Sequence, residues 1–99
     1  MCLSLTLCMF PFSPVYIDST VDMGITVRRI LWGKCVNAGQ TCIAPDYVLC
    51  SKAVQASLVA KAKEVLEEWY GSNVKSSPDF CRIVSDKQFR CVDCRYIYT

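Results

Sequence analysis

The feature that most constrains the fold of this chain is an alternation of short apolar runs with longer stretches of helical periodicity. Residues 15–17 are β-branched and aromatic and are bounded by Pro14 and Asp18, which predicts a short strand. Residues 47–50 form a second, unbroken apolar run, which predicts a strand covered on both faces of a parallel sheet. A helical pattern follows each run. The sequence therefore predicts an α/β fold containing a βαβα unit.

Both helical patterns have identifiable ends. The first carries apolar residues at three-to-four spacing between residues 21 and 36, and Asp22 suits its first turn. Gly39 suits a left-handed position just beyond its last turn. The second helix is expected to start at Ser51 and to end at Gly71. Its apolar stripe consists of Val54, Leu58, Ala62, Val65, Leu66 and Trp69.

Size and charge narrow the classes of function. The chain has 99 residues, of which 53% are hydrophobic, so it suits one globular domain with a modest core. After a polar loop over residues 72–79, a short helix is expected around residues 86–90. The net charge is only +2 and the basic residues are scattered, with Arg28-Arg29 as the one doublet. A nucleic-acid partner is not indicated, and this doublet is expected to face solvent or form ion pairs.

The cysteines and the lack of histidine bear on chemistry. The chain has no histidine, which excludes Ser-His-Asp and Cys-His catalysis and every metal site that needs an imidazole. Its eight cysteines show no regular spacing, and Cys35 and Cys50 fall within apolar-patterned elements, which favours a reducing, intracellular compartment. Cys91 and Cys94 form a Cys-x-x-Cys pair that, with Cys81, offers an alternative prediction of a zinc or redox site.

The first twelve residues are almost wholly apolar, and the first charged residue of the chain is Asp18. The stretch lacks a basic start and a small-residue cleavage site, and Pro11 and Pro14 interrupt it. It is also shorter than the ~20 residues that a membrane-spanning helix needs. We therefore interpret residues 1–12 as an apolar segment that is neither a signal peptide nor a membrane span.

Cys42 closes a distinctive hexapeptide, Asn37-Ala38-Gly39-Gln40-Thr41-Cys42. Trp32-Gly33-Lys34 precedes the hexapeptide, and Ile43-Ala44-Pro45-Asp46-Tyr47-Val48-Leu49-Cys50 follows it. Together these residues resemble the nucleophile loop of aldehyde dehydrogenases of the class 3 type. The resemblance covers residues 13–90, whereas residues 1–12 and the C-terminal tail, residues 91–99, do not follow that pattern. It implies part of the catalytic domain of an aldehyde dehydrogenase fold.

This resemblance implies an oxidoreductase that converts aldehydes to carboxylic acids with NAD or NADP. Cys42 would be the catalytic nucleophile: its thiolate attacks the aldehyde, the thiohemiacetal gives a hydride to the cofactor, and water cleaves the resulting thioester. Gly39 suits the sharp backbone turn beside the reacting carbon, and the Cys42 N–H could support the oxyanion.

Other parts that the resemblance calls for are missing. The family's general base is a glutamate in a Glu-Leu-Gly-Gly-Lys motif before Ser-Pro; here Ser13-Pro14 is kept, but Cys8 occupies the glutamate position. The family's oxyanion-holding asparagine lies far upstream, and Asn37 does not replace it. A missing general base costs ~10²- to 10⁴-fold in rate, and this chain is too short to hold the cofactor-binding domain. We therefore expect a fragment without a cofactor site that is inactive alone.

An alternative prediction is non-enzymatic. A piece of a larger sheet exposes strand edges and apolar faces, which favours an interaction module that associates with a full-length relative or with a second copy of itself. By resemblance the expected location is the cytoplasm, with membrane association at the endoplasmic reticulum left open for a longer relative.

Overall fold

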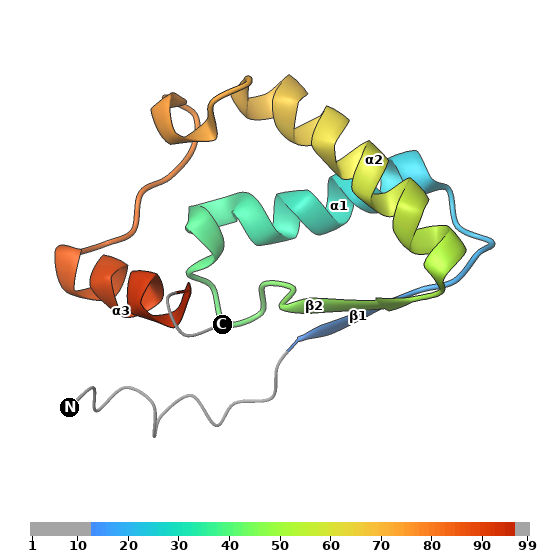
Figure 1. Cartoon of the computed structure of the whole chain (residues 1–99), viewed down its shortest axis with the longest axis horizontal. Helices are drawn as coiled ribbons and strands as arrows, with labels where there is room; N and C mark the ends of the chain where they lie inside the picture. Colours follow the sequence, from blue (N-terminus) through green and yellow to red (C-terminus); the bar gives the residue numbers. More distant parts are fainter. Residues whose placement is uncertain (1–12, 97–99) are drawn as a thin grey trace.

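A two-stranded parallel sheet and the two helices that cover it form the body of the molecule (Figure 1). The computed structural model describes residues 13–96. Its elements, in chain order, are strand β1 (Pro14–Ile17), helix α1 (Met23–Cys35), the 3₁₀ segment η2 (Val36–Gly39), strand β2 (Tyr47–Cys50), helix α2 (Lys52–Tyr70), the 3₁₀ turn η3 (Val74–Ser76) and helix α3 (Asp86–Tyr96). The predicted α/β class and βαβα order are confirmed.

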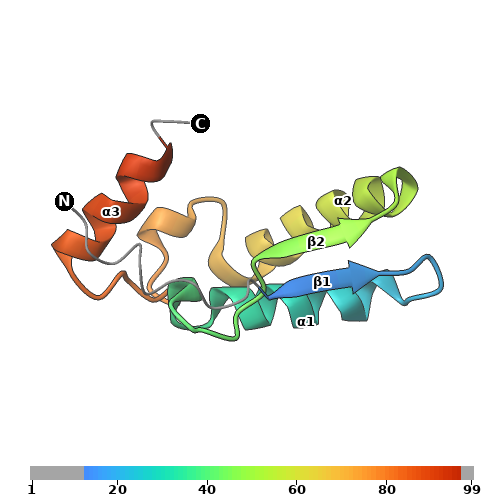
Figure 2. The same cartoon turned by 90° about the horizontal axis from the view of Figure 1, so that it is seen from below.

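The sheet pairs the two predicted strands in parallel. Pro14 lies opposite Tyr47, and the pairing continues in register to Ile17 opposite Cys50. Helix α1 connects the end of β1 to the start of β2, as a parallel pair requires. The two βα turns therefore lie at one end of the sheet and the Cys42 loop lies at the other (Figure 2).

Local sequence signals account for most of the helix ends. The Asp22 side chain accepts a hydrogen bond from the Ile25 N–H at 2.9 Å and so caps α1, one position before the first turn where it was expected. Ser51 caps α2 in the same way through the Val54 N–H. Gly71 ends α2, as predicted, and its φ of 77° with ψ of −176° is a conformation that glycine adopts readily and other residues rarely do.

The core lies between the two long helices and one face of the sheet. Val27 of α1 and Val65 of α2 are each 1% exposed, and Ile17 and Val54 are also buried. Burying such a side chain stabilises the fold by roughly 1.5–3 kcal/mol, so this small cluster supplies much of the driving force. At the rim of the same helix pair, Arg28 and Glu68 form an ion pair that joins α1 to α2.

The opposite face of the sheet is open, which corrects the expectation that β2 is covered on both sides. Tyr16 is 76% exposed and Leu49 is 51% exposed, and the register places them side by side. Tyr47, opposite Pro14, belongs to the same face. Figure 2 shows both strands in front of the helices, with no described element over them. We call Pro14, Tyr16, Tyr47 and Leu49 the open face.

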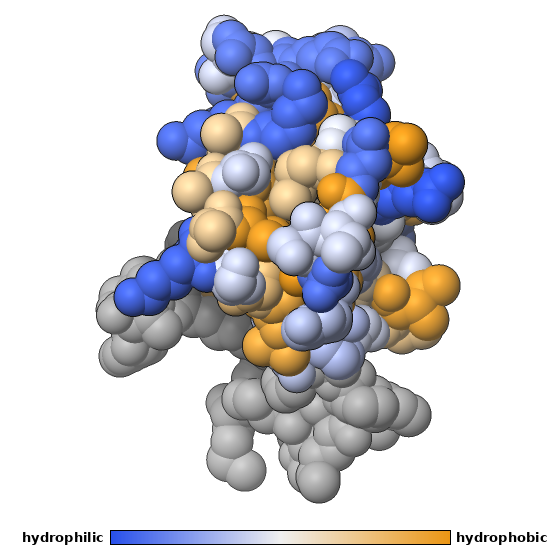
Figure 3. Space-filling view, turned by 90° about the vertical axis from the view of Figure 1, so that its right-hand side faces the viewer, coloured by the Kyte–Doolittle hydropathy of each residue, from blue (hydrophilic) through white to orange (hydrophobic). Residues whose placement is uncertain are grey.

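Apolar exposure extends beyond the sheet. In Figure 3, which looks at the end of the molecule where the strands lead into the helices, polar residues gather at the top and apolar side chains lie among polar ones lower down.

Helix α3 lies at the other end of the molecule, apart from the α1–α2 pair (Figure 1). It begins at Asp86, as predicted for the short helix, but continues to Tyr96.

Two further expectations concern the N-terminal segment and membrane-spanning helices. The interpretation of residues 1–12 falls outside the described residues. Within residues 13–96, no helix combines the length and apolar character needed to cross a membrane.

Candidate functional site

Cys42 lies at the tip of a turn between η2 and β2. The Ala44 N–H donates to the Thr41 carbonyl at 3.0 Å, which makes Cys42 and Ile43 the central residues of that turn. Both side chains are exposed, whereas Ala44 is buried and fixes the turn to the body of the molecule. The predicted nucleophile is therefore presented to solvent, where a substrate can reach its sulfur.

The backbone immediately before this turn is strained. Asn37, Ala38 and Gly39 have φ values of 53°, 54° and 76°, all in the left-handed region. A left-handed conformation costs a residue with a Cβ roughly 1–2 kcal/mol, and such strain persists only where surrounding contacts enforce it. The expected left-handed Gly39 is confirmed. The predicted helix was too long, because α1 ends at Cys35, before the run of left-handed residues begins.

Gly39 also satisfies a spatial requirement. A Cβ added at this position would lie 3.3 Å from the carbonyl oxygen of Lys34 and close to its side chain. A side chain here would therefore meet both an unfavourable φ and a crowded neighbour.

Gln40 holds the strained turn through its carboxamide. Its Nε2 donates to the Asn37 carbonyl at 2.9 Å and to the Arg82 carbonyl at 3.2 Å. Its Oε1 accepts from the Val84 N–H at 2.9 Å. Sequence reasoning missed this residue, although a polar side chain between a predicted left-handed glycine and a predicted nucleophile is a signal that could have identified it.

Polar contacts also fix the far side of the loop. Asp46 Oδ2 accepts from the Ser13 N–H at 2.9 Å, and the Asp46 N–H donates to the Ser13 carbonyl at 3.0 Å. Lys34 Nζ lies 3.5 Å from the other carboxylate oxygen. The Ser13 hydrogen bond, assisted by the charge of Lys34, lowers the pKa of the Asp46 carboxyl. The loop that carries Cys42 is thus tied to α1 and to the start of β1.

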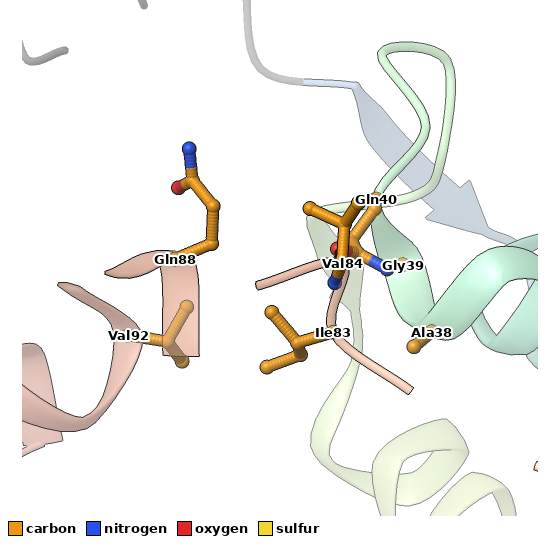
Figure 4. Close-up of a pocket in the computed structure, with 7 residues that line it drawn as sticks. All are labelled: Ala38, Gly39, Gln40, Ile83, Val84, Gln88 and Val92. Atoms are coloured by element: carbon orange, nitrogen blue, oxygen red, sulfur yellow. Dashed lines mark hydrogen bonds between the residues drawn. The ribbon is translucent and has the colours of Figure 1, made fainter. Parts of the chain in front are cut away.

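A cavity of about 410 Å³ opens beside the strained turn (Figure 4). Gln88 and Val92 of α3 line one side, and Ala38, Gly39, Gln40, Ile83 and Val84 line the rest. The lining is mainly apolar, with two carboxamides at its edge. Cys42 does not line this cavity.

The other cysteines have different surroundings. Burial raises the pKa of the Cys35 thiol, which also interacts with the Tyr70 hydroxyl. Cys81 is exposed. Among the residues whose side chains the structure describes, no three cysteine, aspartate or glutamate side chains gather as metal ligands would. Cys94 falls outside that set, so the alternative prediction for the Cys91 and Cys94 pair remains a prediction.

The two βα turns do not fit a dinucleotide. The turn after β1 contains no glycine, Asp18 accepts from the Thr20 N–H within it, and Asp22 caps α1, so two carboxylates occupy the place that a pyrophosphate would need. After β2, Ser51 leads directly into α2 without a loop. Neither turn therefore offers the phosphate-binding loop that a nicotinamide cofactor would use.

Comparison with known proteins agrees with the sequence resemblance. The family model for the aldehyde dehydrogenase family matches residues 5–97. This match reaches into both segments that sequence analysis set apart, and the proposed limits at residues 13 and 90 remain a prediction.

The relatives named in the comparison are much longer than this chain. Aldehyde dehydrogenase family 3 member A2 of Macaca fascicularis is 53% identical over 78 residues, which cover 79% of this chain and 16% of that protein. The dimeric NADP-preferring aldehyde dehydrogenase of Rattus norvegicus is 46% identical over 80 residues, or 81% of this chain and 18% of that protein. This chain thus spans about a sixth of the length of these relatives.

The fold has a solved counterpart as well. A structure described as the substrate-bound state of Staphylococcus aureus AldH superimposes with a TM-score of 0.80 at 39% identity, covering 85% of this chain and 18% of that one. The family-model match over nearly the whole sequence, together with these relatives, shows that the chain belongs to the aldehyde dehydrogenase family.

Proposed function

We propose that this chain is the nucleophile-bearing segment of an NAD(P)-dependent aldehyde dehydrogenase and that Cys42 is its attacking thiol. The observation that carries the proposal is the presentation of Cys42. Its thiol is exposed at the tip of a turn that polar contacts fix on both sides, within a sequence that matches the family.

The step assigned to this chain is covalent capture of an aldehyde. Cys42 Sγ forms a bond to the carbonyl carbon, the carbonyl π bond breaks, and the oxygen takes up the proton that the thiol releases, which gives a thiohemiacetal. No electrons leave the substrate in this step, so it needs no oxidant. The Cys42 N–H, which belongs to the same residue as the sulfur, is the backbone donor we assign to the developing oxyanion.

Later steps require groups that residues 13–96 do not supply. A bound NAD(P) would accept the hydride, but the described turns do not fit it, so we assign no step through it. Within the described residues, the Cys42 thiol also has no hydrogen-bonding or ionic partner that could act as a base. We therefore expect the isolated chain to add to aldehydes without oxidising them.

The test is a competition experiment on the full chain. Iodoacetamide alkylation is followed site by site by mass spectrometry, with and without a medium-chain or aromatic aldehyde. The aldehyde is expected to slow alkylation of Cys42 and to leave that of Cys81, the exposed control thiol, unchanged. Equal effects on both thiols would refute a specific nucleophile.

A parallel assay tests the expected lack of turnover. NAD(P)H production is monitored at saturating aldehyde for the wild type and for Cys42→Ala. No production by either chain is expected. Turnover that disappears in the variant would require a cofactor site and would overturn the fragment interpretation while confirming Cys42.

A second candidate function is that of a non-catalytic interaction module, favoured by the open face. Parallel sheets are normally covered on both faces, and here Tyr16, Tyr47 and Leu49 are uncovered. We infer that a longer aldehyde dehydrogenase chain, or a second copy of this one, is the partner. One relative is named dimeric, which is consistent with such an association.

Coprecipitation with a longer family 3 relative tests this candidate. Tyr16→Lys is expected to weaken association at least about tenfold, because it places a charge on an apolar contact. Val59→Lys, an equally drastic change at an exposed position of α2, is the matched control. Equal binding by both variants would exclude the open face as the contact.

The cellular location is also inferred. Irregularly spaced cysteines, of which Cys35, Cys42, Cys50 and Cys81 carry free thiols, favour a reducing compartment, and we propose the cytoplasm. Thiol labelling of fractionated cells would test it, and recovery of the chain in an oxidising compartment would contradict it.

A further inference from the structure

Gln40 joins the turn ahead of Cys42 to a segment that follows more than forty residues later in the chain. We propose that Gln40 is a positioning residue for Cys42: its carboxamide maintains the left-handed turn at residues 37–39 and anchors it to residues 82–84. The inference rests on the proposed function, because it takes Cys42 as the nucleophile.

The first step of the argument is that the turn needs external support. Asn37 and Ala38 carry a Cβ and yet occupy the left-handed region, which is unfavourable without compensating contacts. Gln40 provides these contacts twice over. Its backbone N–H donates to the Asn37 carbonyl at 3.1 Å and its side-chain Nε2 donates to the same oxygen at 2.9 Å.

The second step is that the anchor requires a carboxamide. Nε2 donates to both the Asn37 and Arg82 carbonyls, whereas Oε1 accepts from the Val84 N–H. A carboxylate could make only the last contact, and an ammonium group could make only the first two. Glutamine is therefore matched to three backbone groups on two separate segments.

The third step is that the anchor acts without burial. Val84 is 80% exposed, so packing does not protect its amide from solvent. The segment is itself restrained, because the Arg82 guanidinium donates to the Ser77 carbonyl at 3.3 Å. Gln40 is thus held on one side of Cys42, and the buried Ala44 holds the other side. This double restraint fixes the backbone that carries the Cys42 side chain.

Amide hydrogen exchange, measured by NMR on the full chain, tests the inference directly. In the wild type, the Val84 N–H is expected to exchange at least about tenfold more slowly than an unstructured amide, although the residue is exposed. An unprotected Val84 N–H in the wild type would overturn the proposal without any variant.

Variants then separate positioning from general destabilisation. Gln40→Met keeps the size of the side chain and removes its hydrogen bonds. It is expected to abolish protection at Val84 and to lower protection at Ala44, the amide that closes the Cys42 turn, by about two- to tenfold. Amides in the interior of α2 should be unaffected. Gln55→Met, the same change on the exposed surface of α2, is the matched control and should alter none of them.

A rescue experiment provides a readout that a purely structural role would not move. Ala38→Gly relaxes the left-handed turn. In the Gln40→Met background it should restore protection at Ala44 but not at Val84, because the hydrogen-bond acceptor remains absent. Loss at both sites with no rescue, or uniform loss throughout α2, would show that Gln40 supports the fold and does not position Cys42.

Failure of this inference and failure of the proposed function give different results. If amide exchange behaves as expected but aldehyde fails to slow alkylation of Cys42, then the hydrogen bonds of Gln40 stand as a structural feature and the nucleophile assignment fails. If aldehyde protects Cys42 equally in the wild type and in Gln40→Met, then the nucleophile assignment stands and the positioning role is overturned.

Discussion

The helical body and the Cys42 loop are stabilised in different ways. The body relies on burial, with Val27 and Val65 each 1% exposed between α1, α2 and the sheet. The loop over residues 36–46 buries little, apart from Ala44, and depends on hydrogen bonds from Gln40 and Asp46. The difference shows how one small chain combines a packed body with a loop that presents the Cys42 side chain to solvent.

The comparison also separates what each region tolerates. A packed core responds to changes of volume, whereas a strained loop responds to changes of backbone freedom and of hydrogen-bond donors and acceptors. A change of one or two carbon atoms should therefore have different effects in the core and in the loop. Each such substitution can be compared with a control substitution at a less constrained position of the chain.

The largest effect is expected in the core. Val65→Ala removes two methylene equivalents from a fully buried site and leaves a cavity, so the free energy of unfolding should fall by roughly 2–3 kcal/mol. Urea unfolding followed by circular dichroism measures this loss. Val59→Ala, on the same helix at a 47% exposed position, should cost less than about 0.5 kcal/mol. Similar losses at the two positions would show that the body is not held by this core.

A smaller effect is expected at the turn. Gly39→Ala places a Cβ at φ 76° and within 3.3 Å of the Lys34 carbonyl oxygen, and should lower the free energy of unfolding by about 2 kcal/mol. Gly33→Ala is the control, because Gly33 lies within α1, has no positive φ, and an added Cβ would come no closer than 3.5 Å to Pro45. It should not destabilise the fold, since alanine is the better helix former by about 1 kcal/mol. A loss at Gly33 as large as that at Gly39 would contradict the importance of the left-handed turn.

The same division explains how far the sequence predicts the structure. Strand order, the caps at Ser51 and Gly71 and the buried positions Val54 and Val65 follow from local patterns, because adjacent residues determine them. The position of Cys42 in an exposed turn also agrees with its motif, while its catalytic role remains a prediction.

The two predictions that were wrong, the end of α1 and the covering of β2, depend on contacts between residues far apart in the sequence. Helix α1 ends early because Asn37 and Ala38 become left-handed, and the contacts that support them reach Arg82 and Val84. No property of Ala38 alone indicates such a conformation. The open face of β2 was missed because a run of four apolar residues shows that burial is favourable, but not whether the described chain supplies a covering layer.

The smallest effect is expected at the polar tie between Asp46, Ser13 and Lys34. The pKa of Asp46 is below its ordinary value of 3.8, chiefly because the carboxylate accepts from the Ser13 N–H. A lowered carboxyl pKa stabilises the folded state above pH 3.8, and this stabilisation disappears as the pH falls through the lower folded-state value. Asp46→Asn should therefore flatten the acid limb of the stability profile below about pH 4.

The cause of this pKa shift can be resolved by a second variant. Lys34→Met removes the ion pair but leaves the Ser13 hydrogen bond in place. Since that hydrogen bond is the larger cause, the Lys34→Met profile should stay close to that of the wild type, and high salt should change it little. If Lys34→Met instead flattens the acid limb as much as Asp46→Asn does, then charge attraction to Lys34 of α1, and not the Ser13 hydrogen bond, is the main cause of the lowered pKa. In that case the Cys42 loop would be held by a contact that salt can loosen.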